Sequence, residues 1–491
     1  MNDLLTGWLA CAVFIVSVRW CYFRLPLHGD TGFYVSNHTI VHKKFRFSEG
    51  WNAQYAGASK FIPEAFYSAL YLTAGNRRYP FISRLMVTLL VAVSCGVVGM
   101  TCRCLLDQNI LISIAAMALF AMISSEAVYV TYHETAEQFE IIPQFLGFGL
   151  IEHGLHHQNS AEVLAGLALW WIDAVWIKLP AAGGAVVLSG YAVFNQPALW
   201  PAILILASAG AGALLMWQKM FHASWFVSYR RLIEHEKYSG HRINLGGYLR
   251  MLRKKLNQLR GIWTWSPIIP TLALLPLCFW RDYSPGVAVY SAIVLLGFFF
   301  QAALINSYLI PFQPVMALLA AWGVDFVWRF SPWPALVLAV LTAAWLIRHF
   351  LKPLTLSVER LNDWSWRGHA FYPSFPEHNL RAHRMAPEIR KVMGGGEGKT
   401  FYIFGDENQI YMLVDRSYPT PIITATPWLD TMDAGWKDAL RRDFDRQKPD
   451  FILSLRRRFE DSAPSRFWPF EARSVRKWDE DWELFECAPK N

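Results

Sequence analysis

The sequence has 491 residues, of which 54% are hydrophobic and 17% are charged, whereas an average soluble domain has about 25% charged residues. Together with a mean hydropathy of +0.22, the repeated long apolar runs indicate a membrane protein that crosses the bilayer many times. The net charge of +8 comes from basic residues in the loops between apolar runs. Such loops favour anionic lipid head groups and lipid phosphates as partners, and they argue against nucleic acid.

The cysteines form neither a disulfide framework nor a zinc site. One of the seven, Cys487, lies in the polar tail, and six lie in or beside apolar runs, namely Cys11, Cys21, Cys95, Cys102, Cys104 and Cys278. No His and Cys residues have zinc-like spacing. The sequence therefore indicates no cofactor, and it leaves open whether a divalent metal is used.

The apolar runs predict an α-helical polytopic membrane protein with about 11 transmembrane helices. The first run has no signal-peptide cleavage pattern, so we expect an uncleaved helix. The predicted spans are Leu4–Phe23, Phe81–Cys102, Ile110–Ser125, Phe139–Leu155, Ala161–Lys178, Ala181–Phe194, Ala198–Trp217, Ser266–Trp280, Gly286–Ile305, Tyr308–Trp328 and Pro334–Phe350. Aromatic and small residues in Trp51 to Leu72 predict amphipathic helices in the membrane interface.

An odd number of spans places the two chain ends on opposite sides and gathers the polar residues of interest on one side. The loops and ends expected on this far side are Arg24–Pro80, Glu126–Gln138, the end of the fifth span at Lys178, Asn306–Tyr308, Gln218–Thr264 and the tail from Lys352. The basic residues do not fix which side is cytoplasmic, because several of these loops are long and the positive-inside rule applies to short ones.

Asp30, in the stretch His28 to Tyr34, follows the first span directly. A carboxylate at that place touches water, lipid head groups and the protein interior, as an acid–base group acting on a lipid-borne substrate must. The alternative is an aspartate that caps a helix or a turn.

Lys178 ends an apolar span, where an ammonium group either extends to the interface or binds an anion. One hypothesis is that it binds a phosphate as a point charge. An internal ion pair with Asp173, five residues earlier, is the competing hypothesis. Lys60, before Phe61-Ile62-Pro63, has the same two interpretations, phosphate binding or extension to the interface.

Glu134 and Glu137 are three residues apart, so they share a face if their loop is helical. Such a pair could orient sugar hydroxyls, supply a second acid or simply cap a solvated helix. A divalent metal held with His133 is disfavoured, since the spacing matches no strong metal motif. The sequence shows no glycine-rich phosphate loop, nucleophile elbow or catalytic Cys/His pair.

The tail after Lys352 predicts a small soluble α/β domain, because strand-like and helix-like segments alternate in it. The expected strands are Thr400–Phe404, Phe451–Ser454 and Trp482–Cys487, the expected helices are Glu407–Val414 and Trp436–Asp445, and Pro421–Ala425 is a further apolar segment.

The order of these motifs resembles the GT-C superfamily of integral membrane glycosyltransferases, in particular its protein mannosyltransferase and aminoarabinose transferase branch. The matching elements, in chain order, are Asp30-Thr31-Gly32-Phe33-Tyr34, Gly50, Tyr55, Lys60 to Pro63, Gly75, Arg84, Glu134 to Glu140, Gly166 to Lys178, Tyr308 with Pro311 and Pro314, Ile403 to Asp406, Tyr411 and Lys448 to Ile452. Two positions depart from the pattern: Thr31 stands where many relatives have a second acid, and Ser307 where a basic residue often precedes the tyrosine.

The resemblance implies a GT-C fold, with residues 1–352 as a transmembrane catalytic domain whose first periplasmic loop is 24–80, and 353–491 as a periplasmic α/β domain. It implies a sugar moved with inversion from a polyprenyl-phosphate donor to an envelope lipid, glycan or protein, at the periplasmic face of the bacterial inner membrane. Asp30 would be the general base, and Lys178 with Lys60 would neutralise the departing phosphate. Tyr34, Glu134, Glu137 and Tyr308 would contact substrate.

Two other classes remain open at this point. A transporter or flippase of lipid-linked sugars would also gather charged residues on one side, but transporters usually show duplicated halves, and none is visible here. A structural partner in an envelope complex would leave the acidic and basic residues without a purpose.

Overall fold

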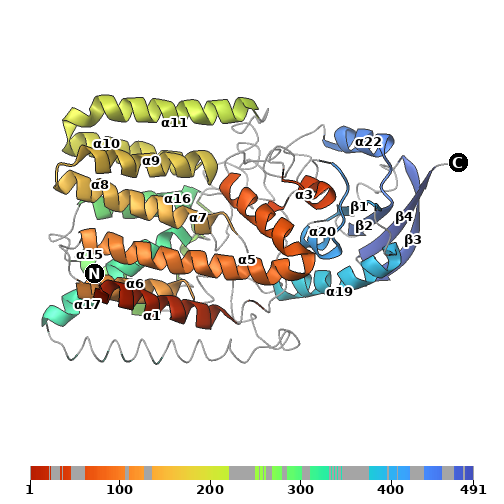
Figure 1. Ribbon diagram of the computed structural model, residues 1–491. Helices are drawn as coiled ribbons and strands as arrows, with labels where there is room; N and C mark the ends of the chain where they lie inside the picture. The colour runs from red at the N-terminus through yellow and green to blue at the C-terminus, as the bar shows by residue number, and fades with distance from the viewer. Residues whose placement is uncertain are drawn as a thin grey trace. The chain divides into compact units, whose positions relative to one another are not determined.

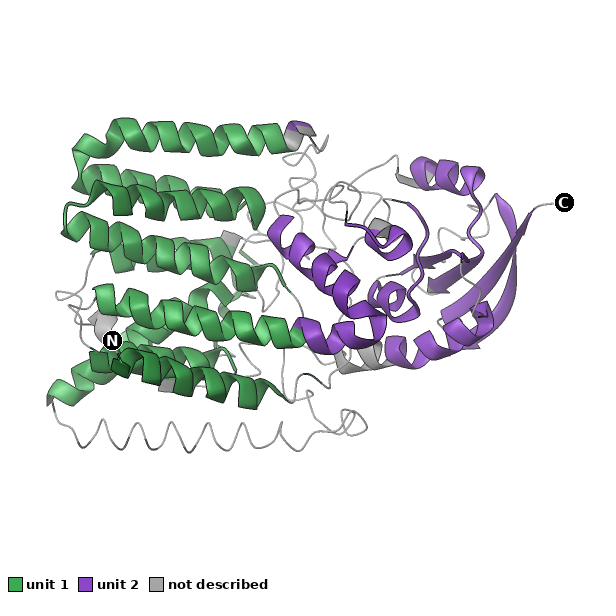
Figure 2. Ribbon diagram, in the orientation of Figure 1, with its two compact units in different colours: residues 1–24, 84–217, 249–373 green, residues 25–83, 218–248, 374–491 purple. Residues whose placement is uncertain are grey.

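The computed structural model describes most of the chain as two compact units, and each is considered by itself (Figures 1 and 2). The described residues are 2–20, 23, 34–35, 37–45, 61–105, 110–125, 135–220, 249–250, 252–253, 255–257, 259–260, 268–278, 285–300, 310–330, 333, 337, 340, 344, 375–394, 398–405, 407–420, 436–455, 469–478 and 482–489. Unit 1 comprises 1–24, 84–217 and 249–373, and unit 2 comprises 25–83, 218–248 and 374–491.

Unit 1 is a helical bundle. Its elements are α1 (Asn2–Arg19), the second part of α5 (Phe61–Leu105), α6 (Ile110–Ile123), α7 (Glu137–Ile141), the π-helix η4 (Ile142–Leu146), α8 (Gly147–His156), α9 (Ser160–Trp176), α10 (Ala181–Asn195), η5 (Pro197–Leu199), α11 (Trp200–Met220), α15 (Ile268–Cys278), α16 (Pro285–Phe300) and α17 (Gln313–Phe330). Helices α8, α9 and α10 pack in sequence, and α17 packs against α15 and α6 (Figure 1). One continuous apolar core joins these helices.

Several helices of unit 1 present apolar side chains outward, as lipid contact requires. On α11, Leu204, Ile205 and Met216 are exposed although they are large and apolar. Among the described helices, four are long and apolar enough to cross a membrane, namely Asn2–Arg19, Phe61–Leu105, Pro197–Trp217 and Ile310–Arg329. Three shorter apolar helices accompany them: Ile110–Ile123, Ala181–Asn195 and Pro285–Phe299.

The first ten predicted spans all coincide with helices, although some boundaries differ. The second predicted span begins at Phe81, but α5 begins at Phe61 and continues through a kink at Gly75, whose φ is 67°. The polar Asn76-Arg77-Arg78 and Pro80 follow the kink directly, so the sequence there looks like a loop end. The eleventh predicted span, Pro334–Phe350, lies almost entirely outside the described residues, and the count of about 11 stays a prediction.

Unit 2 combines segments of the first loop with the tail. Its elements are α3 (Asn37–His42), the first part of α5, α19 (Phe375–Met393), β1 (Phe401–Phe404), α20 (Gln409–Val414), α22 (Trp436–Arg446), β2 (Phe451–Leu455), β3 (Phe470–Trp478) and β4 (Trp482–Pro489). The strands form a mixed sheet in the order β1-β2-β4-β3, in which only β1 and β2 are parallel. The predicted α/β character of the tail is therefore confirmed.

Aromatic side chains build the core of the tail. Tyr402 of β1 lies 5.4 Å from Phe444 of α22 between ring centroids, and Phe401 lies 5.8 Å from Tyr411 of α20. All four residues of β1 are buried, which explains why this strand, at the edge of the described sheet, is entirely apolar or aromatic. The apolar segment Pro421–Ala425 lies outside the described residues.

A polar cluster connects the first-loop segment of unit 2 to its tail segment. Asp415, which ends α20 in the left-handed conformation at φ 59°, pairs with Lys43 at 2.5 Å and accepts a hydrogen bond from the Tyr71 hydroxyl. The ammonium group of Lys43 also lies 5.3 Å from the centre of the Tyr71 ring. Burial and the Asp415 carboxylate raise the pKa of Tyr71. We call these three residues the Asp415 cluster.

Candidate functional site

Three of the seven predicted site residues lie in the described part of the chain: Tyr34, Glu137 and Lys178. Asp30, Lys60, Glu134 and Tyr308 lie outside it, as does His133. The structure therefore tests the surroundings of Glu137 and Lys178 directly. Tyr34 belongs to unit 2, whereas the other two belong to unit 1.

A continuous helical stretch carries the acidic half of the site. It begins with α7 at Glu137, passes through the π-helix η4 and ends with α8 at His156. Glu137 and Glu140 occupy its first turn, where the positive end of the helix dipole favours a negative charge. Pro143 stands at the start of η4, and π-helical turns inside α-helices occur frequently at functional sites.

The basic half follows the end of α9. That helix ends at Trp176, and the backbone N–H groups of Ile177 and Lys178 both donate to the Asp173 carbonyl at 2.8 Å. Lys178 is therefore held in a tight turn just beyond the helix. The predicted span Ala161–Lys178 had placed it in the last turn of the helix instead. A cation is favourable at this end because the dipole of α9 is negative there.

Two glycines bring α8 and α9 close enough for these halves to meet. A Cβ atom placed on Gly166 would lie 2.4 Å from the Gly147 carbonyl oxygen, and one on Gly147 would lie 2.8 Å from the Gly166 carbonyl oxygen. Small residues at such crossings let helix backbones approach inside membranes. The start of the α7–η4–α8 stretch and the end of α9 consequently lie side by side.

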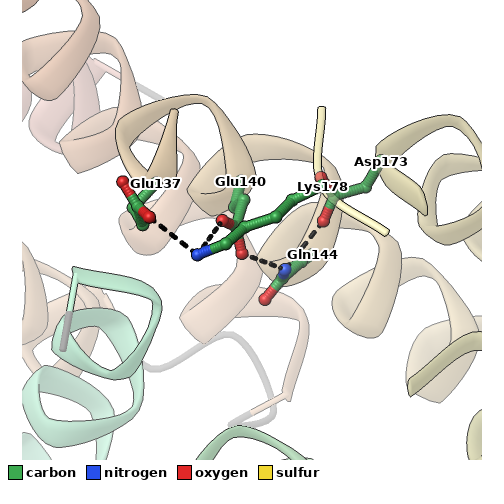
Figure 3. Close-up of polar contacts among 5 residues, drawn as sticks. All are labelled: Glu137, Glu140, Gln144, Asp173 and Lys178. Atoms are coloured by element: carbon green, nitrogen blue, oxygen red, sulfur yellow. Dashed lines mark hydrogen bonds and ion pairs between the residues drawn. The ribbon is translucent and has the colours of Figure 1, made fainter. Parts of the chain in front are cut away.

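The side chains form a chain of contacts that Figure 3 shows. The ammonium nitrogen of Lys178 lies 2.7 Å from Glu137 Oε1 and 3.3 Å from Glu140 Oε1. The amide nitrogen of Gln144 donates to Glu140 Oε2 at 2.9 Å and to Asp173 Oδ2 at 2.7 Å. We call these five residues the Lys178 cluster.

The Lys178 cluster is shielded from solvent. Asp173 is fully buried, and Lys178 is 8% exposed. Charges so deeply buried require partners, because water no longer screens or solvates them. For Lys178 these partners include two carboxylates, so the ammonium group does not extend to the interface alone.

The ion pair between Lys178 and Asp173, which the sequence offered as an alternative to phosphate binding, is not the one that the structure shows. An internal ion pair does form, but with Glu137 and Glu140, while the Asp173 carboxylate is bound by Gln144. Glu140, Gln144 and Asp173 were not among the predicted site residues. The available signal was the presence of polar side chains inside apolar runs, which by itself indicates a site in a membrane protein.

Tyr34 is buried in unit 2 against the first part of α5. Its ring centre lies 5.3 Å from that of Tyr67, and its carbonyl oxygen accepts a hydrogen bond from Ser68 at 3.2 Å. These contacts make Tyr34 part of the packing of unit 2. Its predicted contact with substrate stays a prediction.

No metal site is found among the described residues, since no three His, Cys, Asp or Glu side chains are arranged to hold an ion. In the Lys178 cluster, the carboxylates of Glu137 and Glu140 face the ammonium group of Lys178. The residues 126–134, with His133 and Glu134, lie outside this description.

Comparisons with known proteins find the likeness in structure alone. No family model matches the sequence, and no curated protein matches it. ArnT from Cupriavidus metallidurans bound to undecaprenyl phosphate matches with a TM-score of 0.58 and 14% identity over 98% of both chains. The apo form of the same protein matches with a TM-score of 0.57, 13% identity and the same coverage.

A second kind of neighbour is an Archaeoglobus fulgidus oligosaccharyltransferase tethered with an acceptor peptide, with a TM-score of 0.50 and 10% identity over 99% of this chain and 74% of that one. At these identities the likeness is one of fold. The chain therefore shares its overall fold with ArnT and with the archaeal oligosaccharyltransferase.

Proposed function

We propose that this protein is a membrane glycosyltransferase that takes a sugar from a polyprenyl-phosphate donor and transfers it to an envelope acceptor, which is a glycolipid, a polysaccharide or a protein. The observation that carries the proposal is the fold shared with ArnT over 98% of both chains. The structure of ArnT in that comparison has undecaprenyl phosphate bound. The tethered acceptor peptide in the oligosaccharyltransferase supports an acceptor separate from the lipid in such folds.

In the proposed reaction, the acceptor hydroxyl oxygen attacks the anomeric carbon of the donor sugar. Asp30 takes the hydroxyl proton as general base, and the electron pair of the breaking carbon–oxygen bond leaves with the lipid phosphate. Attack opposite the leaving group inverts the anomeric configuration. Tyr34, Glu134, Glu137 and Tyr308 are proposed to contact substrate.

The surroundings of Lys178 define its proposed role more narrowly than the sequence did. A donor phosphate that reaches its ammonium group must compete with Glu137, 2.7 Å away, and must approach Glu140 as well. We therefore propose that Lys60 supplies much of the positive charge for the phosphate and that Lys178 contributes when Glu137 gives way. Weaker donor binding in Lys60→Ala than in Lys178→Ala is the expected order, measured by titration of the purified protein with undecaprenyl phosphate.

The proposed location is the bacterial inner membrane, with residues 1–352 as the transmembrane part and with loop 24–80 and the domain 353–491 in the periplasm. A periplasmic alkaline phosphatase fused after Asn491 is then expected to be active. An inactive but folded fusion would reverse the proposed orientation.

The decisive test uses Asp30→Asn, which removes the base but keeps the size of the side chain. In a deletion strain, envelope glycans and glycolipids are compared by mass spectrometry after complementation with wild type or variant. Asp30→Asn is expected to reproduce the deletion pattern at wild-type protein level. The matched control is Asp438→Asn on the exposed face of α22, which should restore the wild-type pattern. Restoration by Asp30→Asn would remove this residue from the mechanism.

The same strains separate a transferase from a transporter of lipid-linked sugars. Purified protein in detergent, mixed with lipid extract and acceptor extract of the deletion strain, has no membrane to transport across. A transferase still changes the mass of the acceptor under these conditions. If the acceptor masses stay unchanged while complementation works in cells, the transporter hypothesis is favoured.

A further inference from the structure

The Lys178 cluster contains more acidic than basic groups. Glu137, Glu140 and Asp173 contribute three carboxyl groups, whereas Lys178 contributes one ammonium group (Figure 3). If all four were ionised, negative charges would exceed positive ones by two among the described groups of an almost fully buried place. Such an excess is strongly unfavourable, and a buried acid avoids it by keeping its proton.

The helix ends indicate which carboxyl group keeps the proton. Glu137 and Glu140 lie in the first turn of a helix, where the dipole stabilises their charge, and both face Lys178. Asp173 lies in the last turn of α9, where the dipole opposes a negative charge. Its carboxylate is not paired with Lys178 and contacts the neutral amide of Gln144 instead.

The two oxygens of Asp173 are unequally satisfied. Oδ2 accepts a hydrogen bond from the Gln144 amide nitrogen, which also donates to Glu140. Oδ1 is buried and has no hydrogen-bond partner among the described residues; Glu140 Oε1 has none either, but it lies 3.3 Å from the ammonium nitrogen of Lys178. An ionised carboxylate normally accepts several hydrogen bonds. A protonated carboxyl group requires fewer hydrogen bonds to its oxygens, and its O–H group is itself a donor.

A second unsatisfied group lies in the same neighbourhood. The hydroxyl of Tyr290 on α16 is buried, has no hydrogen-bond partner among the described residues and lies within electrostatic reach of Asp173 and Glu140. Its ring stacks on Phe148 with centres 4.6 Å apart. A hydrogen-bond donor nearby would satisfy the Tyr290 hydroxyl as an acceptor. Tyr290 carries no positive charge, so it does not favour the ionised form of Asp173.

We infer that Asp173 is a proton-binding site and is a neutral carboxylic acid at neutral pH, while Glu137 and Glu140 stay ionised against Lys178. Gln144 contacts Asp173, and the described charged or titratable groups that act on it electrostatically are Glu140, Lys178 and Tyr290; Lys178 is already held by two carboxylates. Under the proposed function, an anionic donor phosphate approaches Lys178. The proton bound to Asp173 then reduces the electrostatic repulsion between the cluster and that phosphate.

Infrared spectroscopy of the full chain in lipid vesicles at pH 7 tests the inference without any assay of activity. A protonated carboxyl group gives a carbonyl-stretching band separate from the amide bands, and this band shifts in D₂O. The wild type is expected to show the band and Asp173→Asn to lose it. Asp415→Asn, which removes a carboxylate paired with Lys43 in unit 2, should keep the band.

Several outcomes would overturn the assignment. The wild type would lack the band if Asp173 were ionised, and Glu140→Gln alone would remove it if the proton resided on Glu140. Asparagine has the size of aspartic acid and no charge, so Asp173→Asn is expected to unfold at the wild-type SDS concentration in mixed micelles. If Asp173→Asn does not fold, wild-type protein with ¹³C-labelled aspartate takes its place: the band is expected to shift, and an unshifted band would place the proton on another group.

Discussion

Each of the two units contains a polar cluster in which a lysine pairs with one or more carboxylates, and the two clusters differ in how deeply these charges are buried. In the Lys178 cluster, one ammonium group faces two carboxylates, and all of them are almost fully buried. In the Asp415 cluster, the Lys43 side chain is 51% exposed and the Asp415 side chain 28%, at a similar separation of charges. Only the Tyr71 hydroxyl there is deeply buried.

The difference shows that burial, rather than distance, determines what an ion pair contributes. Water competes for the charges of Lys43 and Asp415, so their attraction is nearly balanced by lost hydration and lost side-chain freedom. Around Lys178 there is little water, so each charge depends on its protein partners. The four changes below are ordered by the size of the expected effect on unfolding in mixed micelles titrated with SDS.

Lys178→Met is expected to have the largest effect, because it leaves Glu137 and Glu140 buried without their cation. Removing one partner of a buried pair typically destabilises a protein by about 3–5 kcal/mol. The matched control is Lys43→Met, with the same change of side chain at an exposed pair. Equal effects of the two substitutions would contradict the comparison.

Gln144→Leu tests the neutral part of the buried cluster. It removes the amide that donates to both Glu140 and Asp173 while keeping a similar volume. Hydrogen bonds to charged groups contribute about 1.5–3 kcal/mol, so we expect a loss of about 2 kcal/mol. If Gln144→Leu is as stable as wild type, the amide does not stabilise these carboxyl groups.

Tyr71→Phe isolates the buried part of the Asp415 cluster. It removes one hydrogen bond to Asp415 and leaves the ion pair with Lys43. Because the acceptor is a charged but partly exposed carboxylate, we expect a loss at the lower end of the range for such bonds, about 1.5 kcal/mol. A loss as large as that of Lys178→Met would mean that Asp415 depends on Tyr71 far more than on its cation.

Lys43→Ala is expected to have the smallest effect, about 0.5 kcal/mol, because its ion pair is half exposed. High salt should abolish this difference from wild type, since ions screen exposed charges efficiently. The effect of Lys178→Met should persist in the same salt. An effect of Lys43→Ala that resists salt would show that Lys43 stabilises the cluster through packing over the Tyr71 ring.

The bundle could be predicted from sequence because apolar runs report directly on membrane helices. Two elements of the tail were missed for physical reasons. Strand β3 is rich in charged residues, and only Phe470 in it is buried, so no apolar alternation marks it. Helix α19 has Pro387 inside it, which hid the helical spacing of its buried Ala382, Met385, Ala386, Ile389 and Met393.

Predicting the site was harder than predicting the fold. Lys178 and Glu137 could be predicted as candidates because each is a charged residue at the edge of an apolar run. That they contact one another depends on how α8 and α9 cross, which no local pattern of charges reveals. Gln144 and Asp173 were absent from the predicted site because their roles come from partners on another helix. The predicted base, Asp30, lies outside the described residues and stays a prediction.

The contact between Gly147 and Gly166 makes the electrostatics of Lys178 depend on two residues that have no side chain. A single methyl group at either place would act as a wedge between two helix backbones, and it would separate charges without altering any of them. Homologous chains that keep every ionisable residue but enlarge one of these glycines would therefore be expected to bind anions differently. In this fold, spacing at the crossing point is as much a determinant of chemistry as the acids and bases themselves.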